Sequence, residues 1–335
     1  MTAGTAPGRA AGPARTIFFG SGSFAVPILD AVAAHPRLEL VAVVTAADKP
    51  AGRARALTAT PVAIRARSLG APVLQPAGVR SSAVLEELAA LQPDLGVLAD
   101  YGRIIPQALL DLPRLGILGV HPSLLPRHRG ATPIQATILA GDAEAAVAVY
   151  RMDAGLDTGP VLATTRWALE ATERAPELEA EAARRGAALL AANIAAYIDG
   201  TASAQPQADE PASVTTRFTR DHARLDPSQP AAQLERQVRA HAGWPGSFIE
   251  TRAGRLGVLR ASVAAGGGGT VGASPGELVE APDRQPAFVA GDRNLLVLER
   301  VQPAGGREMA GADYLRGHRE LLGTTVASAA TVSER

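Results

Sequence analysis

The densest group of residues that could do chemistry lies between Gly119 and Gly130, in the run Gly-Val-His-Pro-Ser-Leu-Leu-Pro-Arg-His-Arg-Gly. His121 directly follows an apolar run typical of a buried strand and directly precedes a proline. Open α/β folds bind their ligands at the carboxyl edge of the sheet, so this placement makes His121 the best candidate for a catalytic base. A lone histidine is more often a hydrogen-bonded structural residue, so the assignment depends on a partner.

A second run, Met152 to Gly159, offers that partner in a turned loop directly after the next expected strand. Asp157 could pair with His121, fix its orientation and favour the imidazolium that forms when it accepts a proton. Asp153 in the same run is expected to be a solvated loop charge.

A third segment, Gly20-Ser21-Gly22-Ser23-Phe24-Ala25, fits the glycine-rich dinucleotide fingerprint between a strand and a helix. Such a site also needs an acidic residue at the end of the second strand, and that strand ends Val44-Thr45-Ala46-Ala47. A tight glycine turn is therefore the favoured interpretation. A nucleotide or phosphate site, as in a dehydrogenase, is the weaker alternative.

Strands alternate with helices over residues 16–200, which predicts an α/β domain with an open, mostly parallel, Rossmann-like sheet. The helix over 173–198 is expected to break near Gly186. Strands are expected at 16–19, 38–44, 72–74, 95–98, 117–120 and 146–150, with helices at 24–33, 61–69, 82–91 and 133–140.

A composition rich in Ala, Gln, Pro, Asp, Glu and Ser predicts a linker over residues 201–213. Beyond it, one helix at 231–240 and short strands predict a small β-barrel, OB-like domain over 214–322. These strands are expected at 247–251, 256–263, 276–279, 287–290 and 294–301. Residues 1–15 and 323–335 are expected to be a disordered leader and tail.

The composition excludes several kinds of site and of partner. Lys and Arg number 33 and Asp and Glu number 33, so contacts with nucleic acid must be local. The absence of cysteine excludes disulfides, thiolate metal sites and a cysteine nucleophile. No apolar stretch is long enough to span a membrane, and we expect a cytoplasmic protein without membrane contact.

These motifs resemble those of the methionyl-tRNA formyltransferase family, in order across nearly the whole chain. The residues that carry the resemblance are Phe19-Gly20, Phe24 to Pro27, Pro50 to Arg53, Tyr101-Gly102, His121 to Gly130, Ile134-Gln135, Ala140 to Asp142, Gly155 to Gly159, Val238 to Ala240, Trp244 to Gly246 and Tyr314 to Gly317. The histidine and L-D-T-G motifs also mark other enzymes that transfer formyl from 10-formyltetrahydrofolate. The Pro-Ala-Gly-Arg loop and the carboxyl-terminal part point to the tRNA enzyme.

The resemblance implies that the amine of initiator methionyl-tRNA attacks the formyl carbon of 10-formyltetrahydrofolate, to give formylmethionyl-tRNA. In the family the histidine and aspartate manage the proton, and an asparagine two residues before the histidine donates to the oxyanion. His121 and Asp157 match the first two, whereas the third position is Gly119. If the missing amide limits the rate, Gly119→Asn should accelerate transfer.

The resemblance also places the folate against three segments and the tRNA against a fourth. The expected folate-binding residues are Leu98, Asp100, Tyr101, Gly102, Ile104, Ser123, Leu124, Leu125, Pro126 and Leu156. Asp100 is a charge where the family has a small residue, and its role is open. Lys49, Arg53 and Arg55 form a local positive loop for the acceptor stem, with Arg53 as the central contact.

We therefore expect a monomeric methionyl-tRNA formyltransferase that uses folate as a co-substrate and no metal. Two alternatives stay open at this point. One is a formyltransferase acting on another amine, such as a sugar nucleotide. The other is a catalytically impaired folate- or tRNA-binding relative, and the reason to keep it is Gly119 in place of the usual asparagine.

Overall fold

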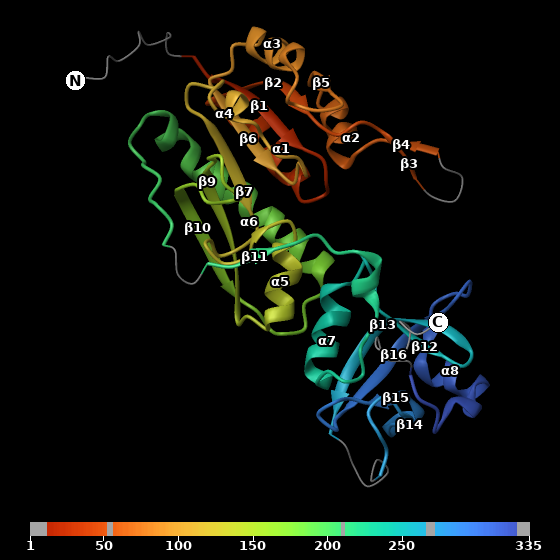
Figure 1. The fold of residues 1–335 in the computed structure, drawn as a ribbon. Helices are drawn as coiled ribbons and strands as arrows, with labels where there is room; N and C mark the ends of the chain where they lie inside the picture. Colours follow the sequence, from red (N-terminus) through yellow and green to blue (C-terminus); the bar gives the residue numbers. More distant parts are fainter. Residues whose placement is uncertain (1–11, 52–55, 209–211, 266–271, 327–335) are drawn as a thin grey trace. The chain divides into compact units, whose positions relative to one another are not determined.

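The computed structural model describes residues 12–51, 56–208, 212–265 and 272–326 (Figure 1). The chain divides into two compact units. The first comprises residues 1–133, 144–167 and 179–215, and the second comprises residues 134–143, 168–178 and 216–335. The first unit ends at residue 215, so the expected linker over 201–213 belongs to it.

A seven-stranded sheet forms the centre of the first unit, in the order β10-β9-β7-β6-β1-β2-β5. Its strands are β1 (Ala14–Gly20), β2 (Leu38–Val44), β5 (Val73–Leu74), β6 (Leu95–Ala99), β7 (Ile117–His121), β9 (Glu144–Arg151) and β10 (Val161–Ala168). The strands from β5 to β7 are parallel, and β9 runs antiparallel to β7. The α/β class and the mostly parallel sheet are confirmed.

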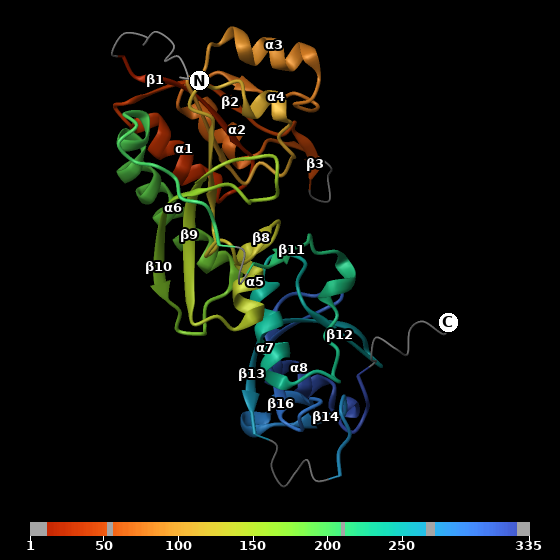
Figure 2. The ribbon, with the colours of Figure 1, turned by 60° about the vertical axis from the view of Figure 1, so that its left-hand side comes forward.

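Two strands lie beside each other at one edge of this sheet, β9 and β10 (Figure 2). Strand β10 is not predicted from the sequence. Its residues alternate between exposed and half-buried, and it lacks the continuous apolar run that marks the inner strands. An edge strand with one wetted face gives this weaker signal.

Helices cover both faces of the sheet. They are α1 (Ala25–Ala34), α2 (Pro61–Ser68), α3 (Ser82–Ala90), α4 (Gln107–Leu110) and α6 (Ala175–Ile198), which continues into the first unit from the second. Leu88 of α3 and Leu109 of α4 share one core with Ile17, Phe19 and Ile117. Side chains alternate between the faces of a strand, so Gly119 and His121 lie on the same face as Ile117.

The opposite face of the sheet packs against α6 at Gly186. A Cβ placed on this glycine would lie 2.9 Å from Val120 Cγ1 and 3.1 Å from Val147 Cγ1. The helix runs without interruption through Gly186, so the expected break is wrong. The glycine allows close approach between helix and sheet, a requirement that the sequence shows only as a weakened helical pattern.

The first unit also contains two short pairs of strands outside the central sheet. Strands β8 (Arg129–Gly130) and β11 (Val214–Thr215) pair in parallel, and β3 (Lys49–Ala51) and β4 (Ala56–Thr58) form a hairpin. The expected linker is held by specific contacts in its described part. Gln205 forms a bridge with Val161, and Ser213 exchanges backbone hydrogen bonds with Pro126 and Arg129.

The described ends of the chain are also more ordered than expected. Strand β1 begins at Ala14, because Arg15 N donates to Asp94 Oδ2 at 2.9 Å and Ala14 pairs with Leu38. Thr325 forms a bridge with Glu277, and Val326 is buried. Residues 14–15 and 323–326 are therefore not part of a disordered leader or tail, and residues 1–11 and 327–335 lie outside the described residues.

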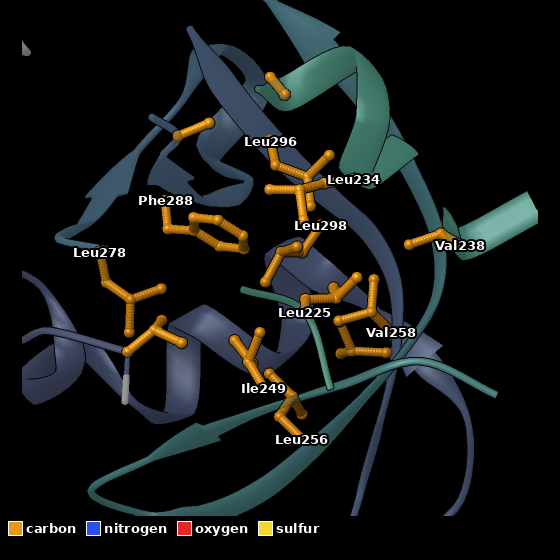
Figure 3. Packing of buried hydrophobic residues seen from close by; sticks show 14 of the residues in the cluster. Leu225, Leu234, Val238, Ile249, Leu256, Val258, Leu278, Phe288, Leu296 and Leu298 are labelled. Atoms are coloured by element: carbon orange, nitrogen blue, oxygen red, sulfur yellow. The ribbon is translucent and has the colours of Figure 1, made fainter. Parts of the chain in front are cut away.

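The second unit contains one sheet of antiparallel strands, in the order β12-β13-β16-β15-β14 with β17 beside β16. Its elements are α5 (Pro133–Ala140), α7 (Ala231–Ala240), β12 (Phe248–Thr251), β13 (Gly254–Ala264), β14 (Leu278–Glu280), β15 (Pro286–Val289), β16 (Leu295–Pro303), β17 (Met309–Ala310) and α8 (Gly311–Gly317), with 3-10 turns at Arg220–Ala223, Pro282–Arg284 and Arg319–Leu321. Figure 3 shows Leu234 of α7 packed with Phe288, Leu296 and Leu298 of the sheet. The predicted small, mainly β second domain is confirmed.

Among the described residues, no helix is long and apolar enough to cross a membrane.

Gly186→Val should destabilise the protein by about 1–3 kcal/mol, because the added methyl groups overpack the contact with Val120 and Val147. Ala192→Val on the exposed side of the same helix is the matched control, and it should cost no more than the roughly 0.7 kcal/mol of helix propensity. Urea unfolding measures both. Equal free energies of unfolding for the two variants would refute close packing at Gly186.

Candidate active site

His121 is the last residue of β7 and is buried at the carboxyl edge of the sheet, as predicted. Its Nε2 lies 2.9 Å from the carbonyl oxygen of His128. A carbonyl oxygen only accepts, so Nε2 carries a hydrogen and donates it. The neutral ring therefore presents Nδ1 as its unprotonated nitrogen.

Asp157 lies on the Nδ1 side of this ring, with Oδ2 at 3.7 Å from Nδ1. The structure thus brings together the two residues predicted to handle the proton. Strand β9 ends opposite Leu118, and the loop after it folds back so that Asp157 reaches His121. Asp157 adopts φ +53°, a left-handed conformation that aspartate and asparagine tolerate better than most residues.

Three groups hold Asp157 in this place. Gly130 N donates to Oδ2 at 2.7 Å, and the Tyr150 hydroxyl donates to Oδ1 at 2.6 Å. The Gln207 amide donates to the main-chain oxygens of Asp157 at 2.9 Å and of Gly159 at 2.7 Å. Both carboxylate oxygens accept a hydrogen bond, so the group is oriented as an acceptor toward His121.

This arrangement can accept one proton and stabilise the charge that results. Nδ1 of His121 has a free lone pair, and the imidazolium that forms on protonation lies next to a fixed carboxylate. A group that releases a proton as it attacks an electrophile would find its acceptor here.

Tyr150 and Gln207 are functional candidates that the sequence analysis does not identify. Tyr150 is buried at the end of an apolar strand, where a phenol needs a partner, and this is the only signal it gives. Burial, first, and the negative charge of Asp157 raise the pKa of Tyr150 well above its ordinary value. Gln207 lies in the expected linker, and nothing in its local sequence marks it.

Gly119 is the register partner of Tyr150 across β7 and β9. A Cβ placed at Gly119 would overlap Tyr150 Cε1 and lie 2.7 Å from Cζ and 2.9 Å from the hydroxyl oxygen. Gly119 lies within β7 and has no positive φ, so the glycine is required for space rather than for backbone conformation. The expected gain from Gly119→Asn alone is therefore corrected, because asparagine has no room unless Tyr150 moves.

The expected folate-binding residues follow the ends of β6, β7 and β9. Leu98 belongs to β6, with Asp100, Tyr101, Gly102 and Ile104 after it; Ser123, Leu124, Leu125 and Pro126 follow β7; and Leu156 follows β9. Ile104 and Leu156 are exposed apolar side chains, at 71% and 55% of their surface. The buried Tyr101 hydroxyl has no hydrogen-bond partner within the described part of the chain. Exposed apolar side chains beyond the strand ends suit a ligand with an apolar face, and folate binding by these residues stays a prediction.

The glycine turn at residues 20–22 is closed to a phosphate by Asp100. The main-chain oxygen of Asp100 accepts from Ser21 N at 2.9 Å and Gly22 N at 3.4 Å. Its carboxylate lies against Gly22, where a Cβ would overlap Oδ2. The turn's amides are already used and a negative charge faces them, which disfavours the dinucleotide alternative.

Asp100 as a whole residue is exposed, but the surrounding protein desolvates its carboxylate. Desolvation, first, and the negative charge of Glu179 raise the pKa of Asp100 to about 6.

Of the expected tRNA-binding residues, Lys49 lies exposed in the β3–β4 hairpin. Arg53 and Arg55 lie outside the described residues. Within the described residues, no three His, Cys, Asp or Glu side chains gather in a way that could hold a metal ion.

Comparison with known proteins places these features in a family. Residues 14–194 match the family described as formyl transferase, and residues 217–319 match the formyl transferase C-terminal domain. The chain is 43% identical to the methionyl-tRNA formyltransferase of Roseiflexus sp. over 92% of this chain and 93% of that relative. It is 42% identical to the methionyl-tRNA formyltransferase of Halorhodospira halophila over 93% of this chain and 99% of that relative.

Solved structures share the fold at lower identity. An N-formyltransferase from Helicobacter canadensis, solved with folinic acid and dTDP-3-aminofucose, matches with a TM-score of 0.61 and 15% identity, over 85% of this chain and 98% of its own. The methionyl-tRNA formyltransferase from Clostridium thermocellum matches with a TM-score of 0.50 and 17% identity, over 74% of this chain and 93% of its own.

Asp100→Asn should stabilise the protein at pH 7.5 and have progressively less effect as the pH falls toward 4. The pKa of Asp100 is about 6 in the folded protein and 3.8 in its unperturbed state, so ionisation between these values favours the unfolded chain. Urea unfolding across this pH range measures the effect. Glu179→Gln removes the second cause and should reproduce part of the gain. A stabilisation that is the same at pH 4 and 7.5 would contradict this assignment.

Proposed function

Because the chain belongs to the methionyl-tRNA formyltransferases, we propose that it transfers the formyl group of 10-formyltetrahydrofolate to the amino group of initiator methionyl-tRNA. Two relatives of that name, at 42–43% identity over more than nine-tenths of the chain, support this activity. The observation that carries the proposal at the level of chemistry is the fixed pair of His121 and Asp157 at the end of β7.

His121 receives the proton that the attacking amine loses. Its Nε2–H is held by the carbonyl of His128, so Nδ1 is the atom that accepts. Asp157 stabilises the resulting imidazolium, and its own position depends on Gly130, Tyr150 and Gln207. When the proton returns to the departing nitrogen, the same pair acts as the acid.

10-Formyltetrahydrofolate supplies the formyl group that the amine accepts. Residues after β6 would hold its ring system, with Ile104 as an exposed apolar contact. Leu156, one residue before Asp157 in the sequence, is a second exposed apolar side chain that would contact the ligand.

The methionyl-tRNA would meet the loop between β3 and β4. The hairpin presents the exposed Lys49, and the sequence adds Arg53 and Arg55 to the same loop. The expectation that the protein works as a monomer in the cytoplasm stays a prediction.

His121→Ala and Asp157→Asn should each reduce formyl transfer by about 10²-fold or more, while the KM values for both substrates change little. Asparagine tolerates the left-handed backbone at residue 157, so this variant keeps the loop. Steady-state formylation of methionyl-tRNA measures the loss. His35→Ala, at the carboxyl end of α1, is the matched histidine control. Two folded variants that retain the wild-type rate would rule out this pair as the proton-handling groups.

Arg53→Ala should weaken the use of methionyl-tRNA and leave the dissociation constant for folate unchanged, with a smaller effect for Arg53→Lys. A guanidinium holds a phosphate or a base edge through two hydrogen bonds, which an ammonium does not reproduce. A salt titration of tRNA binding separates the two contacts: loss of a phosphate contact lowers the slope of log affinity against log salt by about one unit, and loss of a base contact leaves it nearly unchanged.

Arg37→Ala is the control, because it also removes one arginine charge, and the Arg37 side chain pairs with Asp199. Superimposable curves for the wild type and both Arg53 variants would show that this loop does not bind tRNA.

A further inference from the structure

The space above Gly119 is filled by a side chain from the neighbouring strand. Tyr150 is its direct cross-strand partner, and the ring and hydroxyl of Tyr150 stand where a side chain at residue 119 would begin. Residues 119 and 121 lie on one face of β7, so the Tyr150 ring occupies the same face as the His121 imidazole. The two strands thus form a complementary pair, with glycine on one and a phenol on the other.

The Tyr150 hydroxyl makes a definite contact in this space. Its oxygen lies 2.6 Å from Asp157 Oδ1, and only 2% of the residue is exposed. The phenol donates, because the carboxylate has no hydrogen to offer. Burial and the nearby carboxylate raise the pKa of the phenol, so the hydroxyl keeps its hydrogen at neutral pH.

We propose that Tyr150 is a positioning residue of the active site, whose hydroxyl orients Asp157 toward His121 from the space that Gly119 leaves open. The inference rests on the proposed function for its kinetic consequences. Gly130 N donates to Oδ2, the oxygen that faces His121 Nδ1, and the Tyr150 hydroxyl donates to Oδ1. The two donors together fix the orientation of the carboxylate. Gly119 is thus half of a structural pair rather than a defect.

Loss of the hydroxyl would act on the rate through Asp157. With Oδ1 released, the carboxylate can rotate about its Cβ–Cγ bond and bury an acceptor without a donor. The imidazolium of His121 would then lose part of its electrostatic partner, although no contact with either substrate changes. An effect on kcat without an effect on KM is the signature of such a role.

Tyr150→Phe is the direct test, because it removes one oxygen and keeps the ring that fills the space. It should lower kcat by about 10- to 10²-fold, less than the loss of a donor that contacts the reacting atoms, and change each KM by no more than about twofold. The pH–rate profile should also differ from that of the wild type, because the carboxylate that faces His121 has lost the donor to its Oδ1. Tyr197→Phe removes a hydroxyl that donates to Leu115 O at 2.6 Å, and it is the control for losing one hydrogen-bonded phenol, here a half-buried one.

A second set of variants tests the pairing with Gly119. Gly119→Asn alone should lower the rate and the urea midpoint, because its Cβ overlaps the Tyr150 ring. Gly119→Asn combined with Tyr150→Val gives the amide room, and this double variant should be faster than Gly119→Asn alone and than Tyr150→Val alone.

Ring ¹⁵N spectra of His121 supply a readout that needs no substrate. Tyr150→Phe should change their pH dependence and Tyr197→Phe should not. If the wild type fails to formylate methionyl-tRNA while the spectra respond in this way, the proposed substrate is wrong and the positioning role stands. A Tyr150→Phe variant with wild-type kcat, pH profile and His121 spectra would overturn the positioning role.

Discussion

The fixed position of the Asp157 carboxylate is the constraint on which the rest of the site depends. A carboxylate in a loop is normally free to rotate and to turn toward water, and its attraction for a cation is then weak. Here a main-chain N–H of Gly130 and the phenol of Tyr150 each hold one oxygen, and Gln207 holds the main chain at residue 157. The histidine that faces it is equally restricted, through Nε2 and the carbonyl of His128. Two groups that are distant in the sequence thus meet at 3.7 Å in one orientation.

Several segments of the chain contribute to this one geometry. Strand β7 brings His121, strand β9 brings Tyr150, and the segment expected as a linker brings Gln207, whose side-chain oxygen also accepts from Arg129 at 2.9 Å. Ser213 adds backbone hydrogen bonds to the loop between His121 and Gly130. A segment whose composition is typical of a linker therefore helps to shape the candidate active site. Polar side chains with few apolar neighbours can be ordered by hydrogen bonds to a rigid loop.

The sequence predicts most of the fold and half of the site, for reasons that are visible residue by residue. Buried parallel strands carry continuous apolar runs, so β1, β2, β6 and β7 are found close to their true limits. His121 is found because it lies at a strand end directly before a proline, and Asp157 because it lies in a glycine-containing loop that follows a strand. Gly186 is misread, since a glycine that admits close packing looks the same in sequence as one that breaks a helix. Tyr150 and Gln207 are missed because their roles arise from cross-strand register and from a long-range contact, which local sequence does not encode.

Single-turnover formyl transfer by the wild-type protein tests most directly whether the site at His121 and Asp157 acts on methionyl-tRNA, when methionyl-tRNA and an amino-sugar nucleotide are offered in parallel with 10-formyltetrahydrofolate. We expect rapid transfer to the methionyl amine, little transfer to the sugar amine, and loss of transfer in His121→Ala. Transfer to the sugar amine alone, or none to methionyl-tRNA at any enzyme concentration, would contradict this expectation.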